Sequence, residues 1–366
     1  MRGSEPATLE IDREYYGVVG ETKVHRYVLR NQGGLTVRIL DYGGIIQSLE
    51  APDRHGESAN VVLGFPALED YVANNEPAAA RVYLGSIIGR YANRIAGGTF
   101  VLDGTEYRLP RNNGQNCLHG GTAGFDTHVW GASVMRSPDS VGVRLTHLSP
   151  DGDQGYPGRL ATTVTYRLDN QNRVHITYLA TTDAPTVLNL TNHTYWNLAG
   201  EGSGPIDDQR LMINAGRFCP VDADLIPDGS PIPVDGSPFD FRTPVPIGAR
   251  LGVDDPQLSL AHGYDHNWVL EQAEAGSLSL AARVHDPRSG RRLTMWTTEP
   301  GLQFYSGNFL TEALIGTGGR PYHRGAGFAL EPQHFPDSPN RPDFPSTILR
   351  PGDAYRQNTV FELDLD

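Results

Sequence analysis

The segment 189–198, NLTNHTYWNL, carries closely spaced side chains that suit proton transfer and hydroxyl binding. Strand side chains alternate between two faces, so a strand here would place one polar set on one side: Asn189, Thr191, His193, Tyr195 and Asn197. The other side would hold Leu190, Trp196 and Leu198 as anchors in a core. A polar row around one titratable imidazole is typical of a cleft that binds a polyhydroxylated ligand. A solvated face of an antiparallel sheet is the plainer alternative.

Other polar residues that could do chemistry stand at turns or inside apolar stretches. These are Asn93 and Arg94 in GRYANRI, His119 in LHGG, Asp265 in GYDHN, Gln303 in GLQFY and Glu331 in FALEPQ. Each also fits an ordinary role, such as a surface ion pair, a turn cap or the end of a strand. Glu331 fits such a role least well, because apolar neighbours raise a carboxyl pKa towards values useful in catalysis.

The elements that must position these residues are predicted to be strands. Period-two alternation recurs along the chain, and 42 glycines and 27 prolines indicate many turns. We expect strands at residues 23–29, 35–40, 45–50, 99–102, 105–109, 141–148, 160–168, 173–180, 187–195, 278–286, 292–297 and 355–363. Short helical turns are expected at 66–71 and 83–91, and a long loop at 226–246. The fold class is therefore all-β, with large packed antiparallel sheets.

We expect a tag-like or disordered N-terminus over residues 1–12 and one domain over 13–366. The net charge of −13 argues against nucleic acid and membrane surfaces as partners. The two cysteines and the absence of a secretory pattern favour a cytoplasmic location. Cys117 precedes His119 by two positions, yet a buried thiol is favoured over a nucleophile. Histidines scattered singly argue against a metal site.

The chain resembles the aldose 1-epimerase family, also called galactose mutarotases. The segment 189–198 fits the signature of that family: Asn or Ser, any residue, Thr-Asn-His, any residue, Tyr, an aromatic residue, Asn, Leu. Further segments are similar and occur in the same order over roughly residues 20 to 363: GRYANRI, LHGG, GYPG, GYDHN, QFYSGNFL and LEPQHFPDSPN.

This resemblance implies a β-supersandwich that interconverts the α and β anomers of free aldoses such as galactose and glucose. It implies Glu331 as general base and His193 as general acid. The sugar would be bound by Asn93, Arg94, His119, Asp265 and Gln303, and Trp130 or another aromatic residue could stack on it. No cofactor is expected, and the chain would be a monomer or homodimer. For the acid and base to work together, we expect a raised His193 pKa and a Glu331 pKa below it.

Three other functions stay open at this point. A non-catalytic carbohydrate-binding protein of this fold would not need both Glu331 and His193. A glycoside hydrolase could use Asp265 and Glu331 as a carboxylate pair, which leaves His193 without a role. A hexose-6-phosphate 1-epimerase would need an additional basic cluster, and none is evident near the site motifs.

Overall fold

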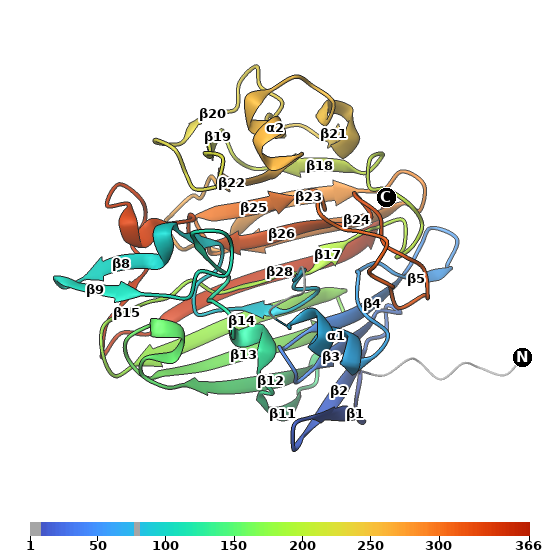
Figure 1. Ribbon diagram of the computed structural model, residues 1–366. Coiled ribbons are helices and arrows are strands. Elements are labelled where there is room, and N and C mark those ends of the chain that lie inside the picture. Colours follow the sequence, from blue (N-terminus) through green and yellow to red (C-terminus); the bar gives the residue numbers. More distant parts are fainter. Residues whose placement is uncertain (1–8, 77–80) are drawn as a thin grey trace, which may run out of the picture.

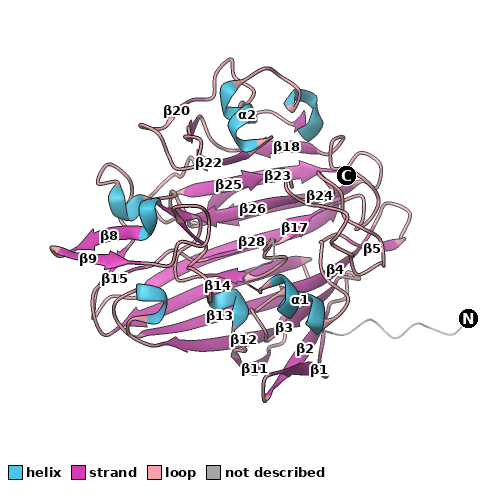
Figure 2. Cartoon of the chain, viewed as in Figure 1, coloured by secondary structure: helices cyan, strands magenta, loops and turns pink. Residues whose placement is uncertain are grey.

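Strands dominate the computed structural model of the protein, which describes residues 9–76 and 81–366. The two α-helices within these ranges are short, α1 (Leu68–Asn74) and α2 (Pro256–Ala261). Figure 2 shows these helices, with a few 3-10 turns, as small cyan elements on the outside of a body of strands. The all-β prediction is confirmed. No helix in the two described stretches is long and apolar enough to cross a bilayer.

Two antiparallel sheets run side by side through the middle of the molecule (Figure 1). The nine-stranded sheet has the order β11 (Gly131–Arg136), β12 (Ser140–Ser149), β13 (Leu160–Asp169), β14 (Arg173–Thr182), β28 (Tyr355–Leu365), β24 (Arg291–Thr297), β23 (Ser279–His285), β18 (Arg210–Ile213) and β21 (Val245–Pro246). The six-stranded sheet has the order β17 (Tyr195–Trp196), β26 (Phe328–Gln333), β25 (Gly301–Tyr305), β22 (Asp265–Val269), β19 (Arg217–Cys219) and β20 (Ile232–Pro233).

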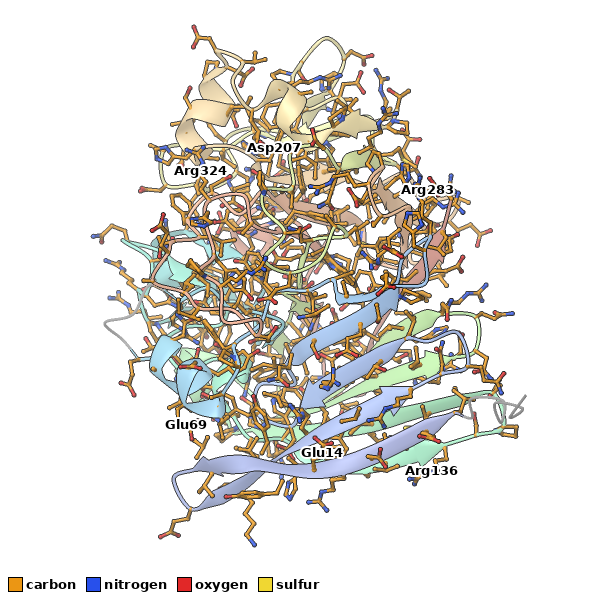
Figure 3. The ribbon with its side chains drawn as sticks, turned by 90° about the vertical axis from the view of Figure 1, so that its right-hand side faces the viewer. Glu14, Glu69, Arg136, Asp207, Arg283 and Arg324 are labelled. Carbon is orange, nitrogen blue, oxygen red and sulfur yellow. The ribbon has the colours of Figure 1, made fainter. Side chains whose placement is uncertain are left out.

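A third sheet of five strands packs against one end of the nine-stranded sheet. It consists of β1 (Glu10–Val19), β2 (Thr22–Arg30), β3 (Thr36–Leu40), β4 (Ile46–Pro52) and β5 (Ser58–Asn60). The guanidinium of Arg136 on β11 donates to the carbonyl of Ile11 on β1 at 3.0 Å. Figure 3 shows the labelled Glu14 and Arg136 together at this lower edge.

The main hydrophobic core lies between the layers. Trp196 on β17 and Phe361 on β28 are nearly inaccessible to solvent, and their ring centroids lie 5.0 Å apart. The same core takes up Leu190 and Leu198. Burying side chains of this size contributes roughly 1.5–3 kcal/mol each, so this contact holds the six-stranded sheet against the nine-stranded one. The anchoring role predicted for Leu190, Trp196 and Leu198 is confirmed.

Short strand pairs connect the large sheets and carry the motifs of interest. They are β6 (Ile87–Ile88) with β16 (Thr191–Asn192), β7 (Arg94–Ile95) with β10 (Cys117–Leu118), β15 (Thr186–Val187) with β27 (Ile348–Leu349), and β8 (Thr99–Leu102) with β9 (Thr105–Arg108). The β8–β9 hairpin turns at Asp103 and Gly104, both with positive φ (49° and 80°), as a two-residue hairpin turn requires.

Several sequence predictions need correction. The continuous strand expected over 187–195 is divided into β15, β16 and β17, because its backbone pairs with three different neighbours in turn. Residues 83–91 form no helix and contain only β6, whereas the helix expected at 66–71 is α1. Helix α2 was not predicted. Residues 1–8 lie outside the described residues, and β1 already begins at Glu10, ahead of the expected boundary at residue 13. The single domain stays a prediction.

Candidate active site

A cavity of about 570 Å³ opens beside β22, β25 and β26 and collects most of the residues singled out in the sequence. Six of the seven predicted site residues line it: Asn93, Arg94, His119, His193, Asp265 and Glu331. The seventh, Gln303, donates from its amide nitrogen to Oδ1 of Asp265 at 2.7 Å. Segments far apart in the chain therefore converge on one pocket of a size typical for small-molecule sites.

Three adjacent strands form the floor of the site. In the register of the sheet, Gln303 on β25 lies between Asn267 on β22 and Glu331 on β26. Directly paired residues point to the same face, so these three side chains form one polar row. Their strands are buried on the other face by Phe304 and Leu330, which belong to the core. The sheet thus holds Glu331 rigidly at the cavity.

His193 lies two residues before β17, the strand that pairs with β26 beside Glu331. Its backbone N–H donates to the carbonyl of Ser86 at 2.9 Å, and its ring stacks on Tyr195 with centroids 4.9 Å apart. Nε2 of His193 lies 3.5 Å from Oε1 of Glu331. The two side chains are in direct contact, without room for a sugar between them. A ligand must therefore lie beside the pair.

Burial reverses the pKa order that we expected for this pair. It lowers the pKa of His193 from 6.5 to about 4. Burial, with a smaller contribution from the Asp265 charge, raises the pKa of Glu331 well above 4.5, and Arg94 opposes this only in part. Both shifts follow from the cost of removing a charge from water. Between the two pKa values, a neutral imidazole lies beside a protonated carboxyl group.

His119 is positioned as a neutral hydrogen-bond donor. Its Nδ1 accepts from the backbone N–H of Asn93 at 3.1 Å, which places the ring proton on Nε2. Burial and the nearby His193 hold the pKa of His119 well below 6.5. The imidazole packs edge-on against Tyr83 and His193, with centroids 4.7 and 5.2 Å away. His119 can therefore offer an N–H to a ligand oxygen without carrying charge.

Three residues of the cavity wall adopt left-handed backbone conformations, which is uncommon for residues other than glycine. The φ angles are 55° for Tyr83, 64° for Asn93 and 51° for His119. Such conformations cost of order 1–3 kcal/mol each and are concentrated at functional sites. These backbone conformations direct the side chains of Tyr83, Asn93 and His119 into the cavity.

Charged and amide groups complete the polar wall. Arg94 donates from Nε to Oδ1 of Asn113 at 3.1 Å, which fixes the guanidinium at the cavity. Burial raises the pKa of Asp265, while Arg94 and the hydrogen bond from Gln303 oppose the shift. This arrangement offers donors from Arg94 and an acceptor from Asp265, the complement of vicinal hydroxyl groups.

Several buried polar atoms at the site have no hydrogen-bond partner among the described residues. They include Nδ1 of His193, Oε1 of Gln303 and Oε2 of Glu331, together with both amide atoms of Asn267 and of Gln333. Buried polar groups are normally paired, and each exception calls for a ligand, a water molecule or a functional reason. The unpaired atoms of His193 and Glu331 belong to the two groups that would exchange protons.

The cavity also contains residues that the sequence analysis missed. They are Arg81, Val82, Tyr83, Arg111, Asn112, Asn113, Leu118, Thr122, Tyr305 and Phe309. Most come from loops without a recognisable spacing, although Leu118 stands inside LHGG, and Tyr305 and Phe309 stand inside QFYSGNFL. Trp130 does not reach the cavity: it is 2% exposed in the core, and its indole N–H donates to the carbonyl of Phe125. Phe309, which is 52% exposed, is better placed at the rim to contact a ligand.

The polar row of segment 189–198 divides into two roles. His193 and Tyr195 line the cavity. The amides of Asn189 and Asn197 instead donate to backbone carbonyls, those of His334 and Ala326 among them, and bind neighbouring segments together. The row is buried, so the solvated-face alternative is wrong.

Cys117 is a structural thiol. It is 1% exposed, and burial raises its pKa to about 12, so no thiolate forms near neutral pH. This confirms the preference for a buried cysteine over a Cys–His nucleophile.

Three residues of the cavity could also ligate a metal by geometry alone. His119, His193 and Glu331 each offer one ligand atom, and these atoms lie within 4.8 Å of one another. The lowered pKa of His193 leaves its imidazole neutral near pH 7, whereas Nδ1 of His119 already accepts from Asn93, so His119 could ligate only through Nε2 in place of its proton. The expectation of a catalytic site without metal stays a prediction, and it is tested below with a chelator.

Comparisons with known proteins agree with the geometry. A family model described as aldose 1-epimerase matches residues 25–362. Galactose mutarotase of Rattus norvegicus is 43% identical, over 98% of this chain and 99% of its own. Aldose 1-epimerase of Escherichia coli K12 is 40% identical, over 91% and 93%. The crystal structure of galactose 1-epimerase from Lactobacillus acidophilus aligns with a TM-score of 0.85 at 30% identity, over 98% and 99%. The chain belongs to the aldose 1-epimerase family.

Proposed function

We propose that this chain is an isomerase that interconverts the α and β anomers of free aldoses, galactose and glucose among them. The observation that carries the proposal is the buried contact between Nε2 of His193 and Oε1 of Glu331, 3.5 Å apart at a polar cavity. Mutarotation needs one group to remove the proton of the C1 hydroxyl and one to protonate the ring oxygen. These two oxygens are both bonded to C1, so the base and the acid that serve them must lie close together.

In the proposed reaction, the Glu331 carboxylate takes the proton of the C1 hydroxyl while His193 gives a proton to the ring oxygen. The C1–O5 bond breaks, and its electron pair stays on the oxygen that His193 protonates. The aldehyde end rotates about C1–C2, and the ring closes on the other face by the reverse transfers. A positioned acid or base typically contributes ~10²–10⁴-fold to such a step.

The proton inventory of the pair fits this scheme. A protonated Glu331 beside a neutral His193 holds one proton, as does the reactive form with a carboxylate and an imidazolium. Ligand binding need therefore only favour the second arrangement. Sugar hydroxyls that donate to the unpaired Oε2 of Glu331 would do so, because hydrogen bonds to the charged form lower a carboxyl pKa. We describe the two groups as one coupled pair for this reason.

We expect a bell-shaped pH profile of kcat/KM with an acid limb below the ordinary histidine range. Below the His193 pKa of about 4 both groups are protonated and no base remains. Above the raised Glu331 pKa both groups have lost their protons and no acid remains. Polarimetric rates of mutarotation across the pH range would measure both limbs. A profile flat from acid to alkali, or an acid limb centred at the unperturbed histidine value of 6.5, would contradict this account.

The remaining predicted residues are proposed to bind the sugar. Arg94 and the neutral N–H of His119 would donate to hydroxyl oxygens, Asn93 would add its amide, and Asp265 would accept from vicinal hydroxyls. Gln303 would orient Asp265 through their 2.7 Å hydrogen bond. Sites that pair hydroxyls in this way reject analogues that lack them, because their own polar groups stay unpaired.

A hexose-6-phosphate 1-epimerase is the second candidate, favoured by one observation. Three arginines, Arg81, Arg94 and Arg111, line the same cavity, although no basic cluster was evident in the sequence. Arg81 is paired with the buried carboxylate of Asp126, and Arg111 donates to the carbonyl of Gly97 and to Gln115. Because Arg81 and Arg111 are already paired, little positive charge is left to bind a phosphate group. Free aldoses are therefore the preferred substrates.

Polarimetry of freshly dissolved α-galactose and α-glucose, with and without protein, tests the proposal. We expect faster approach to anomeric equilibrium than in buffer, undiminished by EDTA, and less acceleration for glucose 6-phosphate. An aryl glycoside should stay intact, which separates the enzyme from a hydrolase. No acceleration for any free aldose would overturn the proposal. A cytoplasmic location and a monomeric or dimeric state are proposed with it, and gel filtration would measure the latter.

A further inference from the structure

A second group of metal-ligating side chains lies outside the catalytic cavity. His128 follows the 3-10 turn η2 (Phe125–Thr127), His147 stands near the end of β12, and Asp153 opens the 3-10 turn η3 (Asp153–Gly155). One ligand atom from each lies within 4.8 Å of the other two. None of the three residues lines the cavity that holds Glu331 and His193.

Both imidazoles of this group have an unused nitrogen. Nε2 of His128 and Nε2 of His147 are buried, and neither has a hydrogen-bond partner in the described part of the chain. The two rings stack with centroids 4.6 Å apart. Phe125 and Trp130 pack against His147 at centroid distances of 5.1 and 5.2 Å, which restricts its rotation. Leaving two buried nitrogens without hydrogen bonds on stacked rings lowers the stability of the fold, and such pairs are uncommon. A ligand shared by both nitrogens would remove this loss.

Hydrogen bonds from neighbouring side chains orient the carboxylate of Asp153. The hydroxyl of Ser149 donates to Oδ2 of Asp153, and its oxygen accepts from Nε of Arg90 at 2.8 Å. Hydrogen bonds of this kind to a ligating carboxylate are typical of metal sites. The other guanidinium nitrogens of Arg90 donate to the carbonyls of Ser149, Pro150 and Pro157, at 2.7 to 3.0 Å. The Arg90 charge is therefore largely engaged by backbone oxygens.

We propose that His128, His147 and Asp153 bind a divalent transition-metal ion of the Zn²⁺ type, with water at the remaining position. Two imidazoles and one carboxylate suit Zn²⁺ and its neighbours better than Mg²⁺ or Ca²⁺, which prefer oxygen ligands. Zn–N and Zn–O bonds are about 2.0–2.2 Å long, so ligand atoms that already lie within 4.8 Å of one another are near the separation that one shared ion requires. His128, His147 and Asp153 are each partly exposed, which gives the ion a path of entry.

The ion would have a structural role. It would join the turn after η2, the end of β12 and η3, three segments that are separated in the chain. No metal site was expected from the sequence because its histidines are scattered singly. Only the fold brings them together, so the test below addresses that expectation directly.

The experiment is calorimetric titration of the chelator-stripped protein with Zn²⁺ alone. We expect one ion per chain at this site and a higher melting temperature with Zn²⁺, because a ligand that binds only the folded state stabilises it. Since loss of a supporting hydrogen bond already costs ~10–100-fold in metal affinity, loss of a ligand in His147→Gln or Asp153→Asn should cost about 100-fold or more. Asp153→Asn provides a second variant at a partly exposed turn should His147→Gln fold poorly.

Two controls separate this site from other histidines. His193→Asn removes one of the three potential ligands in the cavity, which are His119, His193 and Glu331. His175→Asn removes a half-buried imidazole that pairs with Asp169 at 2.8 Å on the same sheet. Both should bind Zn²⁺ at this site as the unmodified chain does. Binding that survives His147→Gln and Asp153→Asn but is lost in His193→Asn would place the ion in the catalytic cavity and overturn the proposal. Absence of any binding would overturn it as well.

Discussion

Replacement of Glu331 by Gln is expected to lower kcat for mutarotation by about 10²–10⁴-fold, the usual contribution of a positioned base. The amide keeps the size and polarity of the side chain but cannot take the proton of the C1 hydroxyl. KM should change little, since Asp265 and Arg94 would still bind the sugar. The residual activity should fall with rising pH, because it depends only on protonated His193. Polarimetry at several pH values measures all three quantities.

The same variant should be more stable than the unmodified chain at neutral pH. The pKa of Glu331 is raised in the folded state, so its contribution to stability is complete below the unfolded carboxyl value of 4.5 and is lost as pH rises through the raised value. The neutral amide in Glu331→Gln does not titrate and would carry no such loss. Thermal melting should therefore show a gain for Glu331→Gln near neutral pH that disappears in acid. This gain also establishes that the loss of activity does not reflect unfolding.

Glu299→Gln is the matched control. Glu299 is as buried as Glu331, at 2% exposed, but its Oε2 lies 2.6 Å from Nδ1 of His334, away from the catalytic cavity. Removal of one partner of a buried pair destabilises the fold, so this variant should melt earlier while its kcat stays near normal. Near-normal kcat in Glu331→Gln, or an equal loss in Glu299→Gln, would contradict the assignment of Glu331 as the base.

The sequence predicted the fold class and the members of the site better than their arrangement. The strands predicted at 99–102 and 105–109 and the anchors around Trp196 depend on local turn chemistry and alternation, and both are present in the structure. The segment around His193 was predicted as one strand, yet it forms three short pairings with different partners. Alternation indicates which side chains are buried, but it contains no information on which neighbour each backbone group finds.

Electrostatics and loop geometry were the least predictable parts. The order of the His193 and Glu331 pKa values depends on how completely each group is removed from water, which only packing decides. The left-handed conformation of His119 and the approach of Arg81 to the cavity are products of loops without a repeating pattern. The motif residues were found because they stand inside recognisable segments, while Arg81 and Arg111 do not.

Replacement of His193 by Asn should also lower kcat by about 10²–10⁴-fold, but with the opposite pH dependence. The amide can donate a hydrogen bond to the ring oxygen, although it cannot give up a proton there. The remaining activity depends only on ionised Glu331, so it should rise with pH through the raised Glu331 pKa to a plateau, without an alkaline limb. Polarimetric rates across the pH range would distinguish this rise from the fall expected for Glu331→Gln.

His175→Asn is the control for loss of an imidazole, since His175 pairs with Asp169 on β14 and lies away from the cavity. Its kcat and pH profile should match those of the unmodified chain. A role of His193 in sugar binding alone would raise KM and leave kcat and the bell shape intact, and such a result would remove it as the acid. Opposite slopes for the two active-site variants would identify His193 as the group that must be protonated and Glu331 as the group that must be ionised. Across their 3.5 Å contact, each then supplies the half of the proton transfer that the other lacks.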